Sequence, residues 1–384
     1  MSPILWQKQG GKRVTIPDID VAGMIKNAHE EALKARGQAN ILIVGKTGSG
    51  KSTLINTVFQ GRMAETGQGK PITQGMKKIT KGGIPVSIYD SKGLEVKDYK
   101  PILAEMMKFI ETTNRNVDSK EHIHAAWICI AEGSRRVEDA EIELAQALSE
   151  KGIPVVIVIT TAISDQGFKS EVETHFPTAV NTVRVNSIEF LDDEGRTNPV
   201  KGVAQLVELT MEVIPEGQKN AFASAQRIKI EHKVDRARLI VAGAAATAGT
   251  AGAAPIPFSD AFAIVPIQIG MLASIAAVFG IDVSMTFLST LVSGTFTSLA
   301  GSIGGRALVG AFLKMFPGAG SIAGGAVSAG VAMALTTAFG EAYITVLKRL
   351  IGDNPDKTPT ASEIAEALKE QMKSVSVTAM FSKS

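Results

Sequence analysis

The chain has 384 residues, of which 45% are hydrophobic and 20% charged, and 40 Lys and Arg against 38 Asp and Glu give a net charge of +2. This composition excludes a mainly disordered or fibrous protein, and near-neutrality leads us not to expect nucleic acid as a partner. A single cysteine, Cys129, excludes an intramolecular disulfide. The first twenty residues lack a signal-peptide pattern, which predicts a cytoplasmic N-terminus.

Charges are distributed unevenly along the chain. Residues 239–345 contain only five charged side chains but sixteen of the 37 glycines. Such a shift in composition marks a domain boundary. It predicts five segments: an N-terminal amphipathic helix within 1–38, an α/β domain at 39–215, a polar connector helix at 216–238, an all-α hydrophobic domain at 239–350, and a linker with a C-terminal helix at 351–384.

Both terminal helices follow from local patterns. Apolar residues recur at helical spacing through residues 17–37. Near the other end, Thr360 and Glu363 have the spacing of a capping box, which predicts a helix ending near Lys373.

Short apolar runs separated by helical patterns fill the segment at 39–215. Strands are expected at 41–44, 84–90, 125–131 and 154–160, with a weaker one at 182–185 and a helix at 138–151. This alternation indicates βαβ units and a mostly parallel sheet with helices on both faces. Ligands bind such sheets at the carboxyl ends of the strands.

The strongest motif follows the first of these strands and fits G-x-x-x-x-G-K-[S/T]. We expect its backbone N–H groups to surround phosphates at a helix N-terminus, with Lys51 reaching the β- and γ-phosphates and the Ser52 hydroxyl ligating Mg²⁺. The expected nucleotide-binding residues here are Gly45, Lys46, Thr47, Gly48, Ser49, Gly50, Lys51, Ser52 and Thr53.

A second motif, D-x-x-G, ends the strand at 84–90. Asp90 is expected to hold Mg²⁺ through water, and the Gly93 N–H to meet the γ-phosphate. Residues 67–74 are expected to form a polar, glycine-rich loop whose Thr73 ligates Mg²⁺ while the γ-phosphate is present, with Thr66 as the alternative. We therefore expect Lys51, Thr73 and Gly93 to serve the reaction.

The stretches 40–56, 71–74 and 90–95 resemble the Era-like branch of the translation-factor-related GTPases. The resemblance implies a P-loop domain that binds GTP or GDP with Mg²⁺ and hydrolyses GTP to GDP and phosphate. Residues 241–246, 252–260 and 264–272 resemble an uncharacterised bacterial family of hydrophobic domains that commonly follow such GTPase domains. Its members are often described as membrane proteins.

The sequence departs from the family pattern where guanine is normally read by N/T-K-x-D. Thr160 fits the first position, but Thr161 and Ile163 replace the lysine and the aspartate. Asp165 lies two residues late and could substitute only in a rebuilt loop. Asn186 and Ser187 are expected in the last base-contacting loop, together with Thr160 and Thr161. We expect GTP to be preferred over ATP, with weakened discrimination.

Leu94 stands where Ras-type enzymes carry a water-orienting glutamine. Hydrolysis should therefore be slow, or completed by another residue, a partner or a second protomer, so a homodimer or oligomer through the GTPase domain is considered. Arg135 and Arg136 are candidates for an arginine supplied in trans, although solvated charges at a helix start are the simpler explanation.

The hydrophobic segment contains charge-free runs at 239–259, 261–281, 283–305 and 315–340, each long enough to cross a bilayer. Against spanning, its ends lack an aromatic belt, and Pro255, Pro257, Pro266 and Pro317 are expected to break the runs. Membrane-embedded, peripheral and soluble arrangements remain open. We expect association with lipid or a membrane partner at the cytoplasmic face, with the basic connector as one contact.

Two functional classes follow. The first is a nucleotide-hydrolysing switch whose hydrophobic domain acts as its effector. The second is an assembly protein in which a near-inactive nucleotide domain controls the helical domain. A ribosome-associated GTPase is a third, weaker alternative, because no RNA-binding appendage or basic tail is present.

Overall fold

A computed structural model of the chain describes residues 6–9, 12–15, 20–66, 68–73, 76–91, 99–192, 194–251, 259–296, 329–353 and 357–373. The chain divides into two units. We call Lys34–Arg236 with Val278–Gly280 the sheet unit, and Met1–Leu33 with Ala237–Ala277 and Ile281–Ser384 the helical unit.

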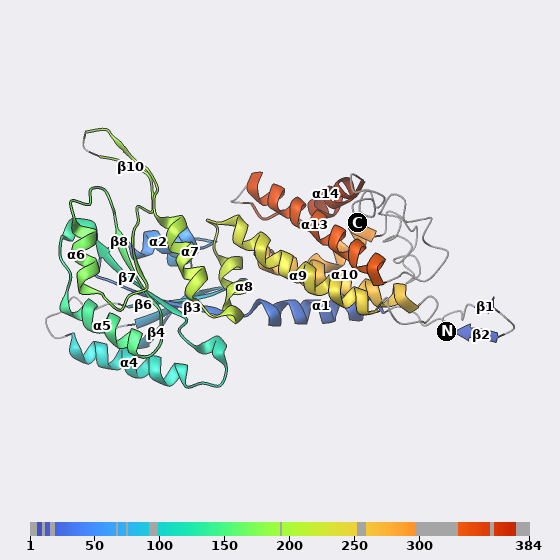
Figure 1. Ribbon diagram of the computed structural model, residues 1–384, viewed down its shortest axis with the longest axis horizontal. Helices are drawn as coiled ribbons and strands as arrows, with labels where there is room; N and C mark the ends of the chain where they lie inside the picture. The colour runs from blue at the N-terminus through green and yellow to red at the C-terminus, as the bar shows by residue number, and fades with distance from the viewer. Residues whose placement is uncertain are drawn as a thin grey trace. The chain divides into compact units, whose positions relative to one another are not determined.

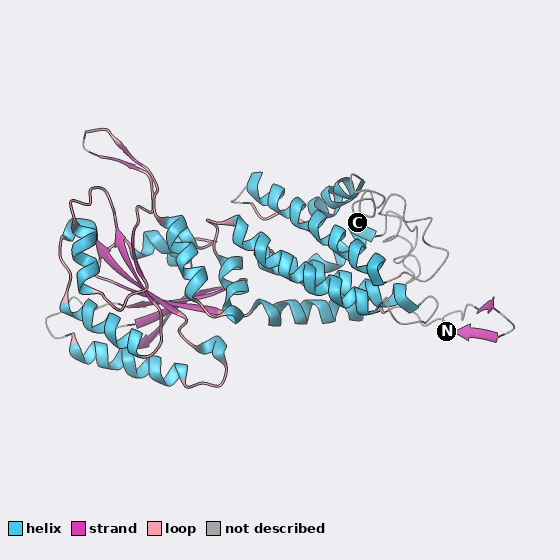
Figure 2. Ribbon diagram, in the orientation of Figure 1, coloured by secondary structure: helices cyan, strands magenta, loops and turns pink. Residues whose placement is uncertain are grey.

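A seven-stranded sheet in the order β4-β5-β6-β3-β7-β8-β9 forms the centre of the sheet unit (Figure 2). Its strands are β3 (Ala39–Val44), β4 (Gln68–Thr73), β5 (Met76–Lys81), β6 (Ile84–Ser91), β7 (Ala125–Ala131), β8 (Val155–Thr160) and β9 (Asn181–Arg184). The strands from β6 to β9 in this order pair in parallel, whereas β4 and β5 are antiparallel. The prediction of a mostly parallel sheet is confirmed.

The antiparallel edge of the sheet differs from the sequence expectation. The pattern predicts a loop at 67–74, but residues 68–73 form β4. Gly69, Lys70 and Pro71 are exposed there. An outer strand needs no apolar pattern and tolerates proline, so this strand carries no signal that separates it from a polar loop.

The two faces of the sheet have separate apolar cores. Ile41 and Ile43 enter one core and Leu42 and Val44 the other, as the alternation of a strand requires. Helices α2 (Lys51–Val58), α7 (Val203–Val213) and α8 (Glu216–Ala225) pack on the first face. Helices α4 (Lys100–Asn114), α5 (Asp139–Glu150) and α6 (Phe168–His175) pack on the second (Figure 1).

Shorter elements complete the described secondary structure. They are α3 (Met63–Thr66), the 3-10 turns η1 (Ser119–Glu121) and η2 (Glu132–Ser134), and the strand pairs β1 (Trp6–Gln9) with β2 (Lys12–Thr15) and β10 (Phe190–Leu191) with β11 (Thr197–Asn198).

The expected connector helix at 216–238 is two helices, α8 and the start of α9 (Ile230–Ala251). Gln226 is fully buried between them, and its Oε1 accepts from Ile228 N and Lys229 N, both at 2.8 Å. Its Nε2 donates to Lys229 O at 2.7 Å. The side chain therefore replaces the helical hydrogen bonds and ends α8 here. Because α8 also packs into the sheet core, it is not a solvated connector.

Within 239–350 the described elements are all helices, as predicted. Besides the strand pair β1–β2, the helical unit contains most of α1 (Val21–Arg36), α9 and α10 (Ser259–Phe279), together with α11 (Met285–Phe296), α13 (Ala329–Asp353) and α14 (Ala361–Lys373). The capping box is present: Thr360 N donates to Glu363 Oε2 at 2.7 Å, and Glu363 N donates to Thr360 Oγ1 at 3.2 Å.

Proline does not break the second apolar run, because Pro266 lies inside α10. Most of residues 264–279 are buried, and this burial offsets the roughly 3 kcal/mol that an internal proline costs a helix. Pro255, Pro257 and Pro317 lie outside the described residues. Within the described part of the chain, α13 is the one helix long and apolar enough to cross a membrane, with a window of mean hydropathy 1.4 that is 61% buried.

Candidate functional site

The loops that carry the predicted motifs all leave the same edge of the sheet. β3, β6, β7 and β8 are parallel neighbours that end at Val44, Ser91, Ala131 and Thr160. The phosphate motif, the D-x-x-G aspartate and the base-loop candidates therefore gather at the carboxyl ends of the strands, where such sheets bind ligands.

The phosphate loop turns tightly after β3. Gly45 has φ 151°, and a Cβ there would lie 2.3 Å from the Cys129 carbonyl oxygen of β7, so only glycine fits. The Lys51 ammonium folds over the loop, donating to Lys46 O at 2.8 Å and to Gly45 O. Ser49 N donates to Lys46 O at 3.1 Å. The loop thus holds a cation on its inner side.

Helix α2 begins directly after this loop. Its N-cap is Gly50, with φ 80° and no side-chain cap, so the first-turn N–H groups have no side-chain acceptor. The Ser49 hydroxyl is buried and has no hydrogen-bond partner, and the Ser52 side chain is exposed. Unpaired donors, a helix N-terminus and a lysine suit the oxygens of a phosphate chain.

Asp90, which the sequence predicts to hold Mg²⁺, lies near the end of β6. Its carboxylate is buried, and its Oδ2 lies 3.7 Å from Lys77 Nζ of β5. No group of three or more His, Cys, Asp or Glu within the described ranges could hold a metal by itself. A Mg²⁺ ion here fits the oxygen donors of Ser52 and Asp90 together with nucleotide phosphates.

Some predicted residues fall outside this description. Gly93 and Leu94 lie outside the described residues. The backbone of Thr73 ends β4, but its side chain and that of Thr66 are not described. Their expected roles remain predictions.

Acidic side chains at the start of α5 interact with the lysines of the phosphate loop. Glu138 pairs with Lys46 Nζ and lies 3.1 Å from Arg136 Nε. The Glu141 carboxylate accepts from Glu138 N at 3.1 Å, and burial raises its pKa to about 7 although Lys46 and Lys51 oppose the shift. The Arg136 side chain is 72% exposed, so this ion pair lies at the protein surface.

Thr160 ties the base side of the site to the phosphate loop. Its buried hydroxyl donates to Ser49 O at 2.6 Å and lies 3.3 Å from Ile130 O. Thr161 has φ 49°, and its hydroxyl donates to Thr160 O at 2.7 Å. The structure thus brings both threonines beside the phosphate loop. The sequence predicts them as base-contacting residues, and that role remains a prediction.

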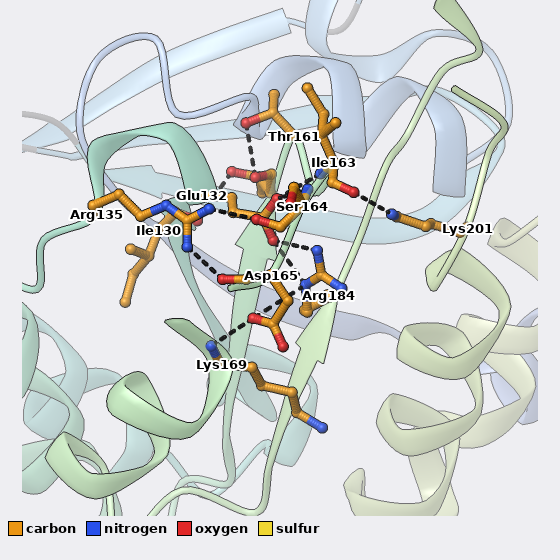
Figure 3. Close-up of polar contacts among 11 residues, drawn as sticks. Ile130, Glu132, Arg135, Thr161, Ile163, Ser164, Asp165, Lys169, Arg184 and Lys201 are labelled. Carbon is orange, nitrogen blue, oxygen red and sulfur yellow. Dashed lines mark hydrogen bonds and ion pairs between the residues drawn. The ribbon is translucent and has the colours of Figure 1, made fainter. Parts of the chain in front are cut away.

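Other base-site candidates make hydrogen bonds within the protein, as Figure 3 shows for Asp165. Asp165 Oδ1 accepts from Lys169 N at 2.8 Å and lies 3.7 Å from Arg184 Nε, so this carboxylate caps α6. Asn186 is buried, and its Nδ2 donates to the carbonyls of Asn198 and Pro199 at 3.1 and 2.8 Å. For Ser187, the carbonyl accepts from Thr57 Oγ1 at 3.1 Å.

Arg135 is bound to its own domain, which speaks against a role in trans. Its guanidinium donates to Ser164 O and Asp165 O (Figure 3). It also lies 5.4 Å from the centre of the Phe168 ring. Glu132, the first residue after β7, was not identified from the sequence. An acid directly after an apolar strand is the signal that could have indicated it.

Comparisons with known proteins agree with this geometry. Residues 40–161 match the model of a family described as 50S ribosome-binding GTPase, and residues 218–374 match a domain of unknown function, DUF697. The GTPase match and the phosphate site together define a P-loop GTPase domain, a GTP-hydrolysing enzyme that uses GTP, GDP and Mg²⁺.

Individual relatives are distant. Translocase of chloroplast 108 from Physcomitrium patens is 32% identical over 84 residues, which are 20% of this chain and 8% of that protein. Toc33 from Arabidopsis thaliana, solved with GDP and Mg²⁺, is 16% identical with a TM-score of 0.31, covering 53% of this chain and 93% of that one. A probable GTP-binding protein, engB, is 19% identical with a TM-score of 0.31, covering 46% and 98%.

Proposed function

We propose that this chain is a slow GTPase switch of the Era-like branch whose nucleotide state controls its hydrophobic helical segment. One observation supports the coupling most directly. Helix α2, which begins at the phosphate loop, ends against the junction of α8 and α9: Gln60 N donates to Ala225 O at 2.9 Å, and Arg227 N donates to Val58 O at 3.0 Å. A shift of α2 would therefore act on the segment that leads along the chain into α9.

Each nucleotide contact has a residue in this proposal. Lys51 and the first-turn amides of α2 bind the β- and γ-phosphates, and Ser52 with Asp90 holds Mg²⁺, which would neutralise charge on those phosphates. Thr73 and the Gly93 N–H would sense the γ-phosphate. Release of these contacts after hydrolysis would be the switching event.

The slow rate follows from Leu94. A leucine side chain can neither orient nor polarise a water molecule. A second protomer or another partner would supply the missing group. Arg135 donates to carbonyls of its own domain, whereas the exposed Arg136 stays a candidate for this role. We therefore propose that turnover rises on self-association through the GTPase domain or on partner binding.

The effector surface is proposed to be apolar and associated with the cytoplasmic face of a membrane. Support comes from the apolar helices α10 and α13. The connector's cations give little support. Lys233 is buried, Arg236 pairs with Glu216, and Lys229 Nζ lies 3.6 Å from Glu208.

The test uses the full chain in GDP and in a non-hydrolysable GTP analogue. Flotation with anionic vesicles should be stronger in one nucleotide state, and vesicles should raise GTP turnover. Equal flotation in both nucleotide states would indicate a membrane anchor that the nucleotide does not control. No flotation in either state, with turnover insensitive to vesicles, would remove the membrane role.

Two alternatives have separate outcomes in the same preparation. Turnover near zero under all conditions, with nucleotide-dependent assembly, would indicate an assembly protein with a near-inactive nucleotide domain. The description of the matched family names ribosome binding. Salt-dependent affinity for ribosomal RNA at physiological salt would favour a ribosome-associated GTPase.

A further inference from the structure

The buried carboxylate of Glu132 accepts hydrogen bonds from the loop that follows β8. Glu132 is 3% exposed, and its Oε2 accepts from Ile163 N at 2.5 Å and from Ser164 N at 2.8 Å. Its Oε1 accepts from Arg184 Nε at 2.7 Å. Glu132, Ile163 and Arg184 belong to the carboxyl ends of β7, β8 and β9, so one side chain joins three neighbouring strands at the ligand-binding edge (Figure 3).

Charge makes this contact strong. Hydrogen bonds from amides or a guanidinium to an ionised carboxylate are about twice as strong as neutral ones. A buried carboxylate is stable only when its oxygens are satisfied, and both oxygens of Glu132 are.

The same loop is held through its carbonyls. Arg135, three residues after Glu132, donates to Ser164 O and Asp165 O, and Lys201 Nζ lies 3.4 Å from Ile163 O. Arg135 has φ 45°, a left-handed conformation that non-glycine residues seldom adopt. Side chains on both sides therefore fix the main chain of residues 163–165.

This loop occupies the place where relatives read the base with lysine and aspartate. Here Ile163, 50% exposed, stands at the aspartate position, and the carboxylates of Glu132 and Asp165 are engaged within the protein. Because both carboxylates accept hydrogen bonds within the protein, this edge offers a base a fixed loop conformation and not an acid aimed at it.

We propose that Glu132 is the positioning residue for nucleoside recognition, holding the loop after β8 where it covers the base. The inference rests on the proposed binding of a guanine nucleotide at this site. It requires that Glu132 act on the nucleoside part of the ligand and leave the phosphate loop, which has its own contacts, unaffected.

The test compares GTP with inorganic triphosphate, both with Mg²⁺, on the full chain. Glu132→Gln keeps the side-chain shape but loses the charge and one acceptor, so GTP affinity should fall roughly tenfold or more. Affinity for triphosphate should not change. Arg135→Ala, on the exposed side of the loop, should show the same pattern. Glu121→Gln, an exposed carboxylate 4.0 Å from Lys78, is the control and should change neither affinity.

Three results would overturn the role of Glu132. They are unchanged GTP affinity in Glu132→Gln, an equal loss for GTP and triphosphate, or a loss in Glu132→Gln that Arg135→Ala does not share. A wild-type chain that binds triphosphate but not GTP would instead contradict the proposed function itself. Retained triphosphate binding in the variants also shows that they are folded.

Discussion

Lys233 should make the free energy of unfolding depend on pH, and the size of this effect follows from the surroundings of its side chain. It is 2% exposed, and its Nζ donates to Ser224 O at 2.8 Å and lies 3.4 Å from Phe279 O. Both acceptors are neutral carbonyls. Burial therefore lowers the pKa of this lysine from 10.5 to about 7.

The sign and size follow from proton linkage. Because the folded pKa lies below the unfolded one, the unfolded state binds more protons between the two values, and the free energy of unfolding rises with pH there. Between about pH 7.5 and about pH 9 the unfolded lysine stays charged while the folded one is mostly neutral. The gain over this window is about 2 kcal/mol. Lys233→Met removes the titrating group, so the gain should disappear.

Urea unfolding of the full chain at both pH values measures this gain. Trp127 is buried in the sheet unit and reports its unfolding once the other tryptophan is removed by Trp6→Phe. Lys229→Met, which changes a half-buried lysine beside Glu208, is the matched control and should keep the wild-type gain. An equal gain in wild type and Lys233→Met would refute a neutral Lys233 in the folded protein.

Three further predictions concern the base side, the phosphate loop and the helical unit. The carboxylates of Glu132 and Asp165 are engaged within the protein, so neither should bind the 2-amino group of guanine. The affinity for ITP, which lacks this group, should therefore lie within about threefold of the affinity for GTP in a competition assay. A GTP preference of several orders of magnitude would contradict this. Thr160→Val leaves the buried Ser49 carbonyl without its donor and should lower the free energy of unfolding by about 1–3 kcal/mol. Thr160→Ser keeps the hydroxyl and should retain most of the wild-type stability. Equal stability of the two variants would be inconsistent with the contact. A Cβ at Gly340 would lie 2.4 Å from Val241 Cγ2, so Gly340→Ala should destabilise the helical unit by about 1–3 kcal/mol. Gly270 has open space around it, so Gly270→Ala should stabilise α10 by about 0.5–1 kcal/mol. Thermal unfolding measures both effects.

The sequence predicts those parts of the fold whose residues carry a periodic or spacing signal. Strands β3, β7 and β8 are buried and read as continuous apolar runs. The phosphate motif appears between a strand and a helix, as the chemistry requires. In the edge strand β4, Gly69, Lys70 and Pro71 are exposed, so its composition does not distinguish it from a loop.

Contacts made through single side chains could not be predicted from the sequence. The end of α8 depends on Gln226 folding back onto residues 228 and 229, which no propensity indicates. Asp165 was a reasonable substitute base reader from spacing, but it caps α6. Glu132 needed the strand order to be known, because its partners lie 31 to 52 residues away.

The central claim is that the loop after β3 and the start of α2 bind the phosphates of GTP. The most direct test is the Mg²⁺-dependent affinity of the full chain for a fluorescent GTP analogue, measured for wild type and for Lys51→Ala. Lys51 is the cation that folds over this loop, and its loss should weaken binding roughly thirtyfold or more. Wild-type affinity in Lys51→Ala would contradict the account of the site.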